Sequence, residues 1–310
     1  MNVTFDPLAG DPLRPDDWSG FIGQEPMKER LIKNIDAAVQ DLRPPAHTLL
    51  MAAPGTGKTT LARLIALRMG VDLEVFTCPV DFKTIVKLLV QDDFSGVLLL
   101  DEIHRLSRSE QGDYLTLIES GYLEFRGEKF RVGWLMVIGA TTEKKNIIKP
   151  LRQRFPFRPE FDDYTDVEIQ KILQNMTRRL GFEMPDATAA PLAKACVGTP
   201  RRARDFAFAA RDLRILGTVD PTADEVLDHL RIDPNGLGRE HWKYLDALQK
   251  LGGQAGMRPL RAYLGESEQE IEEIESVLLD QGLITYTPRG RELRTAAFER
   301  IRNRKLEEEK

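Results

Sequence analysis

One ten-residue stretch, MAAPGTGKTT at residues 51–60, constrains the fold of this chain more than any other feature. It fits the phosphate-binding pattern G-x-x-x-x-G-K-[ST], except that Ala52 stands where the pattern has its first glycine. An apolar run precedes the stretch and a good helix-forming run follows it, which is the strand, loop and helix order that such a loop requires. We therefore predict a nucleotide-binding α/β domain, in which Ala52 is tolerated provided that its φ angle is negative.

The residues of this loop have distinct expected roles. Backbone N–H groups of the loop and of the helix start point at phosphate oxygens. Lys58 is expected to reach the β and γ phosphates, and Thr59 to ligate Mg²⁺. The predicted cofactors are therefore ATP and Mg²⁺, and the residues expected to bind them here are Pro54, Gly55, Thr56, Gly57, Lys58, Thr59 and Thr60.

A second acidic element, VLLLDE, ends an apolar run at Asp101 and Glu102. An acidic pair in this position is by itself often only the start of a helix. Combined with the phosphate loop it predicts hydrolysis, with Asp101 holding Mg²⁺ through water and Glu102 orienting the attacking water. We expect the nearby His104 to pack or to join a polar network, because the four histidines and two cysteines show no metal-ligand spacing.

Hydrophobic periodicity divides the 310 residues into three domains, which agrees with the length of the chain. Residues 1–161 alternate β-rich runs with helical patterns, as in a parallel sheet covered by helices. Residues 162–236 show apolar positions at helical spacing only. Residues 237–310 follow a turn-forming DPNGLG and end in two short runs around a Pro-Arg-Gly turn, which suggests a hairpin behind a helix-turn-helix. The predicted fold class is α/β, with a P-loop domain, an all-helical lid and a C-terminal winged helix.

Charge is distributed unevenly along the chain. The formal net charge is −5, which argues against a protein that coats nucleic acid indiscriminately. Residues 285–305, however, hold seven basic and two acidic side chains. Arg289, Arg291 and Arg294 lie at or beside the expected hairpin tip, where we expect them to contact DNA phosphates without reading the bases. The alternative is a basic surface helix near the C-terminus.

Targeting signals are absent from the sequence. The first residues have no basic start followed by an apolar stretch, and the longest apolar runs are far shorter than a membrane span. The two cysteines, Cys78 and Cys196, lie far apart. We therefore expect a protein of the reducing cytoplasm.

Several motifs, taken in their order along the chain, resemble those of the AAA+ ATPases and, within them, of the RuvB family of Holliday-junction branch-migration motors. The motifs are RPDDWSGFIGQEPMKERL, PGTGKTTLA, LLLDEIHRLSR, IGATTEKKNIIKPLRQRF, GTPRRAR and LLDQGLITYTPRGR. The resemblance implies a homo-oligomeric, hexameric ring that translocates on double-stranded or branched DNA at the expense of ATP.

The same resemblance implies roles for further residues. Thr142 is similar to the first sensor, Arg201 to a second sensor that contacts the nucleotide of its own subunit, and Arg154 to an arginine finger that reaches the neighbouring subunit. Guanidinium groups suit such roles because they stabilise charge on the transferring phosphoryl group. Ile22 and Gly23 are expected to line the adenine pocket. Without the ordered motifs, the two arginines would be read as surface residues.

Two alternatives keep the nucleotide site but change the function. In the first, the chain is an AAA+ switch that loads or remodels a protein partner on DNA, although the expected wing is unlike the helical collar of such loaders. In the second, it is a DNA-binding regulator in which nucleotide only controls assembly. The presence of Glu102, Thr142 and Arg154 disfavours the regulator, because a scaffold that does not hydrolyse ATP has no need of them.

Residues 121–132, GYLEFRGEKFRV, are expected to form a hairpin with RGEK at its tip. In the RuvB family the corresponding insertion is longer, has a more apolar tip and docks the partner RuvA. A short, charged tip exposes little apolar surface, so we expect that a RuvA-like partner does not dock in the manner of the relatives. The alternative is that Tyr122, Leu123 and Phe125 on the stem still present an apolar face.

Overall fold

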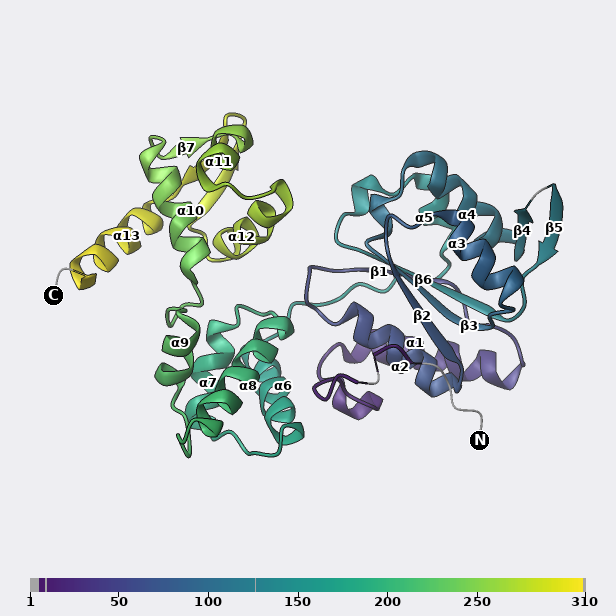
Figure 1. Ribbon diagram of the computed structural model, residues 1–310, viewed down its shortest axis with the longest axis horizontal. Coiled ribbons are helices and arrows are strands. Elements are labelled where there is room, and N and C mark those ends of the chain that lie inside the picture. Colours follow the sequence, from purple (N-terminus) through teal and green to yellow (C-terminus); the bar gives the residue numbers. More distant parts are fainter. Residues whose placement is uncertain (1–5, 9, 126, 309–310) are drawn as a thin grey trace. The chain divides into compact units, whose positions relative to one another are not determined.

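The structure is a computed structural model that describes residues 6–8, 10–125 and 127–308 (Figure 1). Contacts divide the chain into two compact units. The first comprises residues 1–183 with 199–204, and the second comprises residues 184–198 with 205–310. The domain boundaries that we expected at residues 161 and 236 stay a prediction.

A four-stranded parallel sheet forms the centre of the first unit, and its strands lie in the order β1-β6-β3-β2. The strands are β1 (Thr48–Met51), β2 (Asp72–Thr77), β3 (Gly96–Asp101) and β6 (Leu135–Thr141). Because the strands are parallel, the carboxyl ends of β1, β6 and β3 lie side by side at one edge of the sheet. The predicted P-loop architecture is therefore confirmed.

Helices cover both faces of this sheet (Figure 1). Alternate residues of β3 point in opposite directions, so that Val97 and Leu99 pack on one side and Leu98 and Leu100 on the other. Burial on both faces explains why the strands read as continuous apolar runs in the sequence. The helices on the Leu99 side are α1 (Glu25–Gln40) and α2 (Lys58–Met69), and those on the Leu98 side are α3 (Phe82–Val86), α4 (Arg108–Ser120) and α5 (Lys149–Arg154).

Local sequence sets the ends of the helices that carry the site. Helix α2 begins directly after Gly57, at φ 103°, and ends directly before Gly70, at φ 65°; both glycines have left-handed conformations that favour glycine. A capping box formed by Ser107 and Glu110 begins α4. Thr165 caps the start of helix α6 (Asp166–Arg179) with the same arrangement, together with Glu168. The unit also has the short 3-10 helices η1 (Trp18–Gly20), η3 (Ile103–Arg105) and η4 (Lys144–Asn146), and a π-helical turn, η2 (Lys87–Gln91), that continues α3.

The expected hairpin at residues 121–132 is present as the antiparallel pair β4 (Tyr122–Phe125) and β5 (Glu128–Arg131). Leu123, which is 1% exposed, belongs to the core on the Leu98 side of the sheet, whereas Tyr122 is 42% exposed. The apolar stem therefore turns Leu123 inward and Tyr122 outward. Arg126 at the tip lies outside the described residues.

The second unit contains helices followed by a winged helix. The helical part has α7 (Asp186–Ala195), α9 (Ala223–Leu230) and, from Asp205 onward, α8 (Pro200–Ile215). The winged helix has α10 (Arg239–Lys250), β7 (Gln254–Ala255), α11 (Met257–Leu264), α12 (Glu268–Asp280), β8 (Ile284–Thr287), β9 (Gly290–Leu293) and α13 (Thr295–Glu308). Its strands pair in the order β7-β9-β8 and share one apolar core with its helices. The predicted helical region and wing are confirmed. Among the described helices, none combines the length and the apolar character needed to cross a membrane.

Candidate functional site

The phosphate-binding loop connects β1 to α2, as the sequence predicts. Ala52 has no positive φ angle, and its N–H donates to the carbonyl of Thr141 at 3.2 Å, so the expectation for this position is confirmed. Gly55, at φ 78°, approaches the start of α8 so closely that an added Cβ would lie 2.8 Å from Cβ of Arg201. The loop therefore depends on glycine at residue 55, although it tolerates alanine at 52.

Lys58 is held inside this loop. Its side chain is buried, and Nζ donates to the carbonyls of Ala52 at 2.9 Å and Ala53 at 3.0 Å. Burial lowers the pKa of Lys58, and the carboxylates of Glu102 and Asp101 oppose that shift. A buried cation in a loop of this kind is suited to the terminal phosphates of a nucleotide.

The acidic pair lies at the carboxyl end of β3. Glu102 has a left-handed backbone, with φ 52°, and its N–H donates to Oδ1 of Asp101 at 3.0 Å. Burial, together with the neighbouring charge of Glu102, raises the pKa of Asp101, while Lys58 opposes the shift. A divalent cation would relieve this repulsion, so the carboxylates fit Mg²⁺ on their chemistry.

Thr142 lies next to the acidic pair because β6 neighbours β3 in the sheet. Its hydroxyl donates to Oε2 of Glu102 at 3.2 Å. The loop after β1, the acidic pair at the end of β3 and Thr142 after β6 thus lie at adjacent strand ends. This arrangement places the hydroxyl of Thr142 against Glu102, the residue that we expect to orient the attacking water.

His104 joins the polar network that we expected. Its Nδ1 lies 3.0 Å from Oγ1 of Thr141 and 3.2 Å from Oε2 of Glu102, and its Nε2 lies 3.4 Å from Oε1 of Glu143. His104 thus lies between Glu102, Thr141 and Glu143 in one polar network.

The two arginines have different surroundings. Arg201 is exposed in the first turn of α8, beside Gly55, and its charge influences the pKa of Lys58 and of Asp101. Arg154 ends α5 and forms an ion pair with Glu119 at 2.9 Å on the surface of the first unit. Only Arg201 is therefore brought to the phosphate loop of its own chain.

Gly23, expected at the adenine pocket, has φ 75°, and an added Cβ would lie 2.7 Å from Oε1 of Glu168. Its neighbour Ile22 is partly buried. Two aromatic residues that sequence reasoning missed complete this side of the loop. The ring of Phe21 lies so close to Gly57 that a Cβ added at residue 57 would be 3.2 Å from it. The hydroxyl of Tyr164 donates to the carbonyl of Thr56 at 3.1 Å. The sequence offers only the position of Phe21 beside Ile22 as a signal, and none for Tyr164.

The wing places its arginines differently from one another. Arg289 is exposed at the turn between β8 and β9, and Arg294 is exposed just after β9. Arg291, which we expected to reach a phosphate, points inward. Its Nε and Nη2 bind the carboxylate of Glu275 at 2.8 Å and 3.1 Å.

Glu275 explains why Arg291 turns inward. This carboxylate is 0% exposed and also accepts hydrogen bonds from the hydroxyls of Tyr244 at 2.8 Å and Tyr286 at 2.7 Å. A buried carboxylate needs a cationic partner, and Arg291 is the one bound to it. The structure therefore directs Arg291 toward Glu275 and not outward as we expected, whereas Arg289 and Arg294 are exposed. That wing arginines contact DNA stays a prediction.

Comparison with known proteins gives the same architecture. The family described as the Holliday junction DNA helicase RuvB P-loop domain matches residues 13–161, and the RuvB C-terminal winged helix domain matches residues 234–302. The chain is 35% identical to the Holliday junction branch migration complex subunit RuvB of Rubrobacter xylanophilus, over 90% of this chain and 83% of that protein. It is 33% identical to the protein of the same name from Ligilactobacillus salivarius, over 95% and 93%.

A solved structure agrees over the same extent. The Thermotoga maritima RuvB Holliday junction branch migration motor superimposes with a TM-score of 0.84 at 32% identity. The similarity covers 94% of this chain and 99% of that one. The likeness thus includes the nucleotide-binding unit, the helical region and the winged helix.

Proposed function

Because the chain belongs to the RuvB family of Holliday junction branch-migration motors, we propose that its phosphate site is the ATP-hydrolysing engine of such a motor. The chain is an ATP-dependent DNA helicase of this family. The observation that carries the proposal is the meeting of the P-loop, the acidic pair and Thr142 at adjacent strand ends. Lys58 binds the β and γ phosphates, and Glu102 orients and polarises the attacking water.

The surroundings of Glu102 suit this role. Oε2 accepts from Thr142, and His104 lies 3.2 Å from the same oxygen, so the carboxylate is held in one place before substrate arrives. Thr59 and Asp101 would hold Mg²⁺, which neutralises phosphate charge during hydrolysis. The raised pKa of Asp101 supports a cation at this position.

The arginines act on either side of the nucleotide. Arg201, next to Gly55, contacts the phosphates bound by its own chain as the second sensor. Arg154, exposed on α5, is available to a neighbouring subunit and serves as the arginine finger. A finger that works between subunits requires a closed ring, and we propose a homohexamer. Ile22 and Gly23, with Phe21 and Tyr164 nearby, form the adenine side of the site.

The partners follow from the same membership. The DNA is double-stranded or branched, and Arg289 and Arg294 of the wing bind its phosphates. The relatives are described as subunits of a branch migration complex. Our expectation that the short hairpin excludes a RuvA-like partner has no support in the comparisons, and we propose such a subunit as a partner. We further propose that the protein works in the cytoplasm, where bacterial DNA is branched by recombination.

The function is tested by the DNA dependence of ATP hydrolysis. We expect a four-way junction to stimulate ATP hydrolysis more than linear duplex of equal length does. We also expect branch migration to separate labelled junctions into duplex products only when ATP is present. A loader of a protein partner would not migrate junctions. A nucleotide-controlled regulator would bind DNA without stimulated turnover, so either result would contradict the proposal.

The two wing arginines provide a paired prediction. Arg289→Ala should weaken DNA binding about equally for all sequences and reduce the slope of log K against log salt by roughly one unit, because one phosphate contact is lost. Arg291→Ala should instead destabilise the winged helix by about 3 kcal/mol, because it leaves Glu275 buried without its cation.

Binding isotherms at several salt concentrations and thermal unfolding of both variants separate these effects. Each variant is the control for the other. An unchanged melting temperature for Arg291→Ala, or an unchanged salt slope for Arg289→Ala, would contradict the corresponding assignment.

A further inference from the structure

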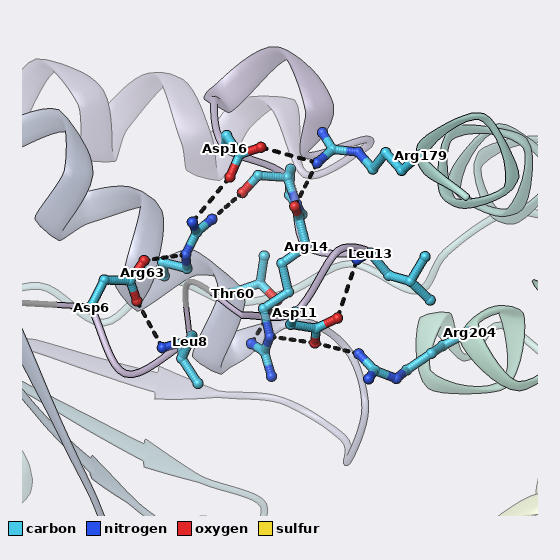
Figure 2. Close-up of polar contacts among 11 residues, drawn as sticks. Asp6, Leu8, Asp11, Leu13, Arg14, Asp16, Thr60, Arg63, Arg179 and Arg204 are labelled. Carbon is cyan, nitrogen blue, oxygen red and sulfur yellow. Dashed lines mark hydrogen bonds and ion pairs between the residues drawn. The ribbon is translucent and has the colours of Figure 1, made fainter. Parts of the chain in front are cut away.

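The N-terminal segment of residues 6–17, described apart from residue 9, runs across α2, the start of α8 and the end of α6 (Figure 2). We call it the N-terminal strap. Its carboxylates bind arginines of all three helices, and every contact lies within the first unit. These contacts form two clusters, one around Asp11 and one around Arg63.

Asp11 forms the first cluster. Its Oδ2 accepts from Nε of Arg14 at 2.9 Å and from Nη1 of Arg204, and its Oδ1 accepts from the N–H of Leu13 at 3.2 Å. Nη1 of Arg14 donates to Oγ1 of Thr60 at 3.3 Å. One carboxylate thus joins an arginine on α8 to an arginine that binds the first turn of α2 (Figure 2).

The charge of Asp11 is maintained in this position. Burial opposes the charged form, but hydrogen bonds from Arg204, from the Leu13 N–H and from Arg14 more than offset it, so the pKa lies below its usual range. Two guanidinium groups therefore share one ionised carboxylate. Without that carboxylate the two cations would repel each other and push the start of α8 away from α2.

The place of Arg204 in α8 gives this contact its importance. Arg204 follows Arg201 by three residues, about one helical turn, so both side chains lie on the same side of the helix. Arg201 packs against Gly55 of the phosphate loop. Thr60 directly follows the expected Mg²⁺ ligand Thr59. The series of contacts from Thr60 through Arg14 and Asp11 to Arg204 consequently connects the first turn of α2 with the first turns of α8.

The second cluster anchors the strap independently. The buried guanidinium of Arg63 on α2 binds Asp6 at 2.6 Å, Asp16 at 3.0 Å and the carbonyl of Pro15 at 2.7 Å. Arg179 of α6 donates to the carbonyl of Arg14 at 2.5 Å. Removing the carboxylate of Asp11 therefore leaves the strap bound on both sides of residue 11, at Asp6 and at residues 14–16.

We propose that Asp11 is a positioning residue for ATP hydrolysis, which holds the first turn of α8, and with it Arg201, against the phosphate-binding loop. The inference rests on the proposed role of Arg201 as a sensor. Asp11 does not touch the nucleotide. It acts by neutralising Arg204 and Arg14 together, and so sets the distance between the lid helix and the loop.

The test is a comparison of four proteins: the unaltered chain, Asp11→Asn, Arg201→Ala and the double variant. Asn keeps the shape of Asp11 but removes its charge, so we expect the KM for ATP to rise about fivefold or more as the charged hydrogen bonds are lost. Arg201→Ala should raise it further. If Asp11 acts through Arg201, the double variant should match Arg201→Ala alone, because the positioned side chain is already gone.

Asp36→Asn is the matched control, because Asp36 binds Arg68 at 2.8 Å in the same unit but away from the loop. It should leave KM and kcat unchanged. Arg204→Gln should raise the KM for ATP as Asp11→Asn does. Asp11→Glu keeps the charge, so its KM should lie between those of the unaltered chain and Asp11→Asn. These two variants also decide the matter if Asp11→Asn folds poorly.

The outcomes distinguish this inference from the proposed function. If Arg201→Ala weakens ATP use but Asp11→Asn and Arg204→Gln do not, or if the effects of Asp11→Asn and Arg201→Ala multiply, Asp11 does not position Arg201 and the inference is wrong. If Arg201→Ala itself has no effect, the sensor role fails, and the inference falls with it.

Discussion

A Glu102→Gln protein should bind ATP as tightly as the unaltered protein and hydrolyse it about 10²- to 10⁴-fold more slowly. The amide fills the same space and still accepts a hydrogen bond from Thr142, but it has no negative charge with which to polarise water. The loss should appear in kcat, with the affinity for ATP unchanged. Nucleotide binding by fluorescence and steady-state hydrolysis with junction DNA measure the two quantities separately.

Lys58→Ala is the contrasting variant. Lys58 lies buried in the loop, so its removal leaves the charge of the β and γ phosphates uncompensated, and binding itself should be lost. Near-normal turnover by Glu102→Gln would show that another group activates the water. Unchanged ATP affinity of Lys58→Ala would exclude residues 52–60 as the phosphate site.

An Arg154→Ala protein should also bind ATP normally, and it should hydrolyse ATP on the order of 10³-fold or more slowly once assembled. The physical reason is that a guanidinium stabilises charge that develops only in the transition state, so its loss affects turnover more than binding. Arg154 is exposed and forms only a surface ion pair with Glu119, so the substitution should leave the fold intact. Single-turnover hydrolysis and thermal unfolding check both statements.

Mixing decides whether the finger acts between subunits. Assemblies that combine Arg154→Ala and Glu102→Gln chains contain some interfaces at which an intact finger faces an intact site. These assemblies should therefore recover activity that neither variant has alone. Glu119→Gln, which removes only the surface partner, is the control and should be close to normal. Absence of recovery in rings shown to be mixed would count against a finger in trans.

Much of the nucleotide-binding unit could be predicted because its signals are local. The phosphate loop occupies ten consecutive residues between an apolar run and a helix, and Glu102 directly follows the run of β3. The strands are buried on both faces, so they read as continuous apolar runs and predict a parallel sheet. Once the sheet is parallel, adjacent strand ends must share one edge, which brings Thr142 to Glu102.

The wing shows where local signals stop. The Pro-Arg-Gly turn predicts the hairpin, and the hairpin forms between β8 and β9. The direction of each arginine depends instead on what lies beneath it. Arg289 has the exposed turn around it, whereas Arg291 has the buried carboxylate of Glu275 below its strand. Nothing in the spacing of the two arginines distinguishes them, because only packing places α12 under the wing.

The sequence by itself determined the elements, their order and the chemistry of the phosphate loop, since hydrophobic period, turn residues and motif spacing are properties of neighbouring residues. The tertiary structure alone decided which distant side chains complete the site. Tyr164 binds the carbonyl of Thr56 across 108 positions, and Arg204 binds Asp11 across 193. Periodicity relates residues over a few turns of helix or strand, but ion pairs and hydrogen bonds over such separations form only after packing has brought their backbones together.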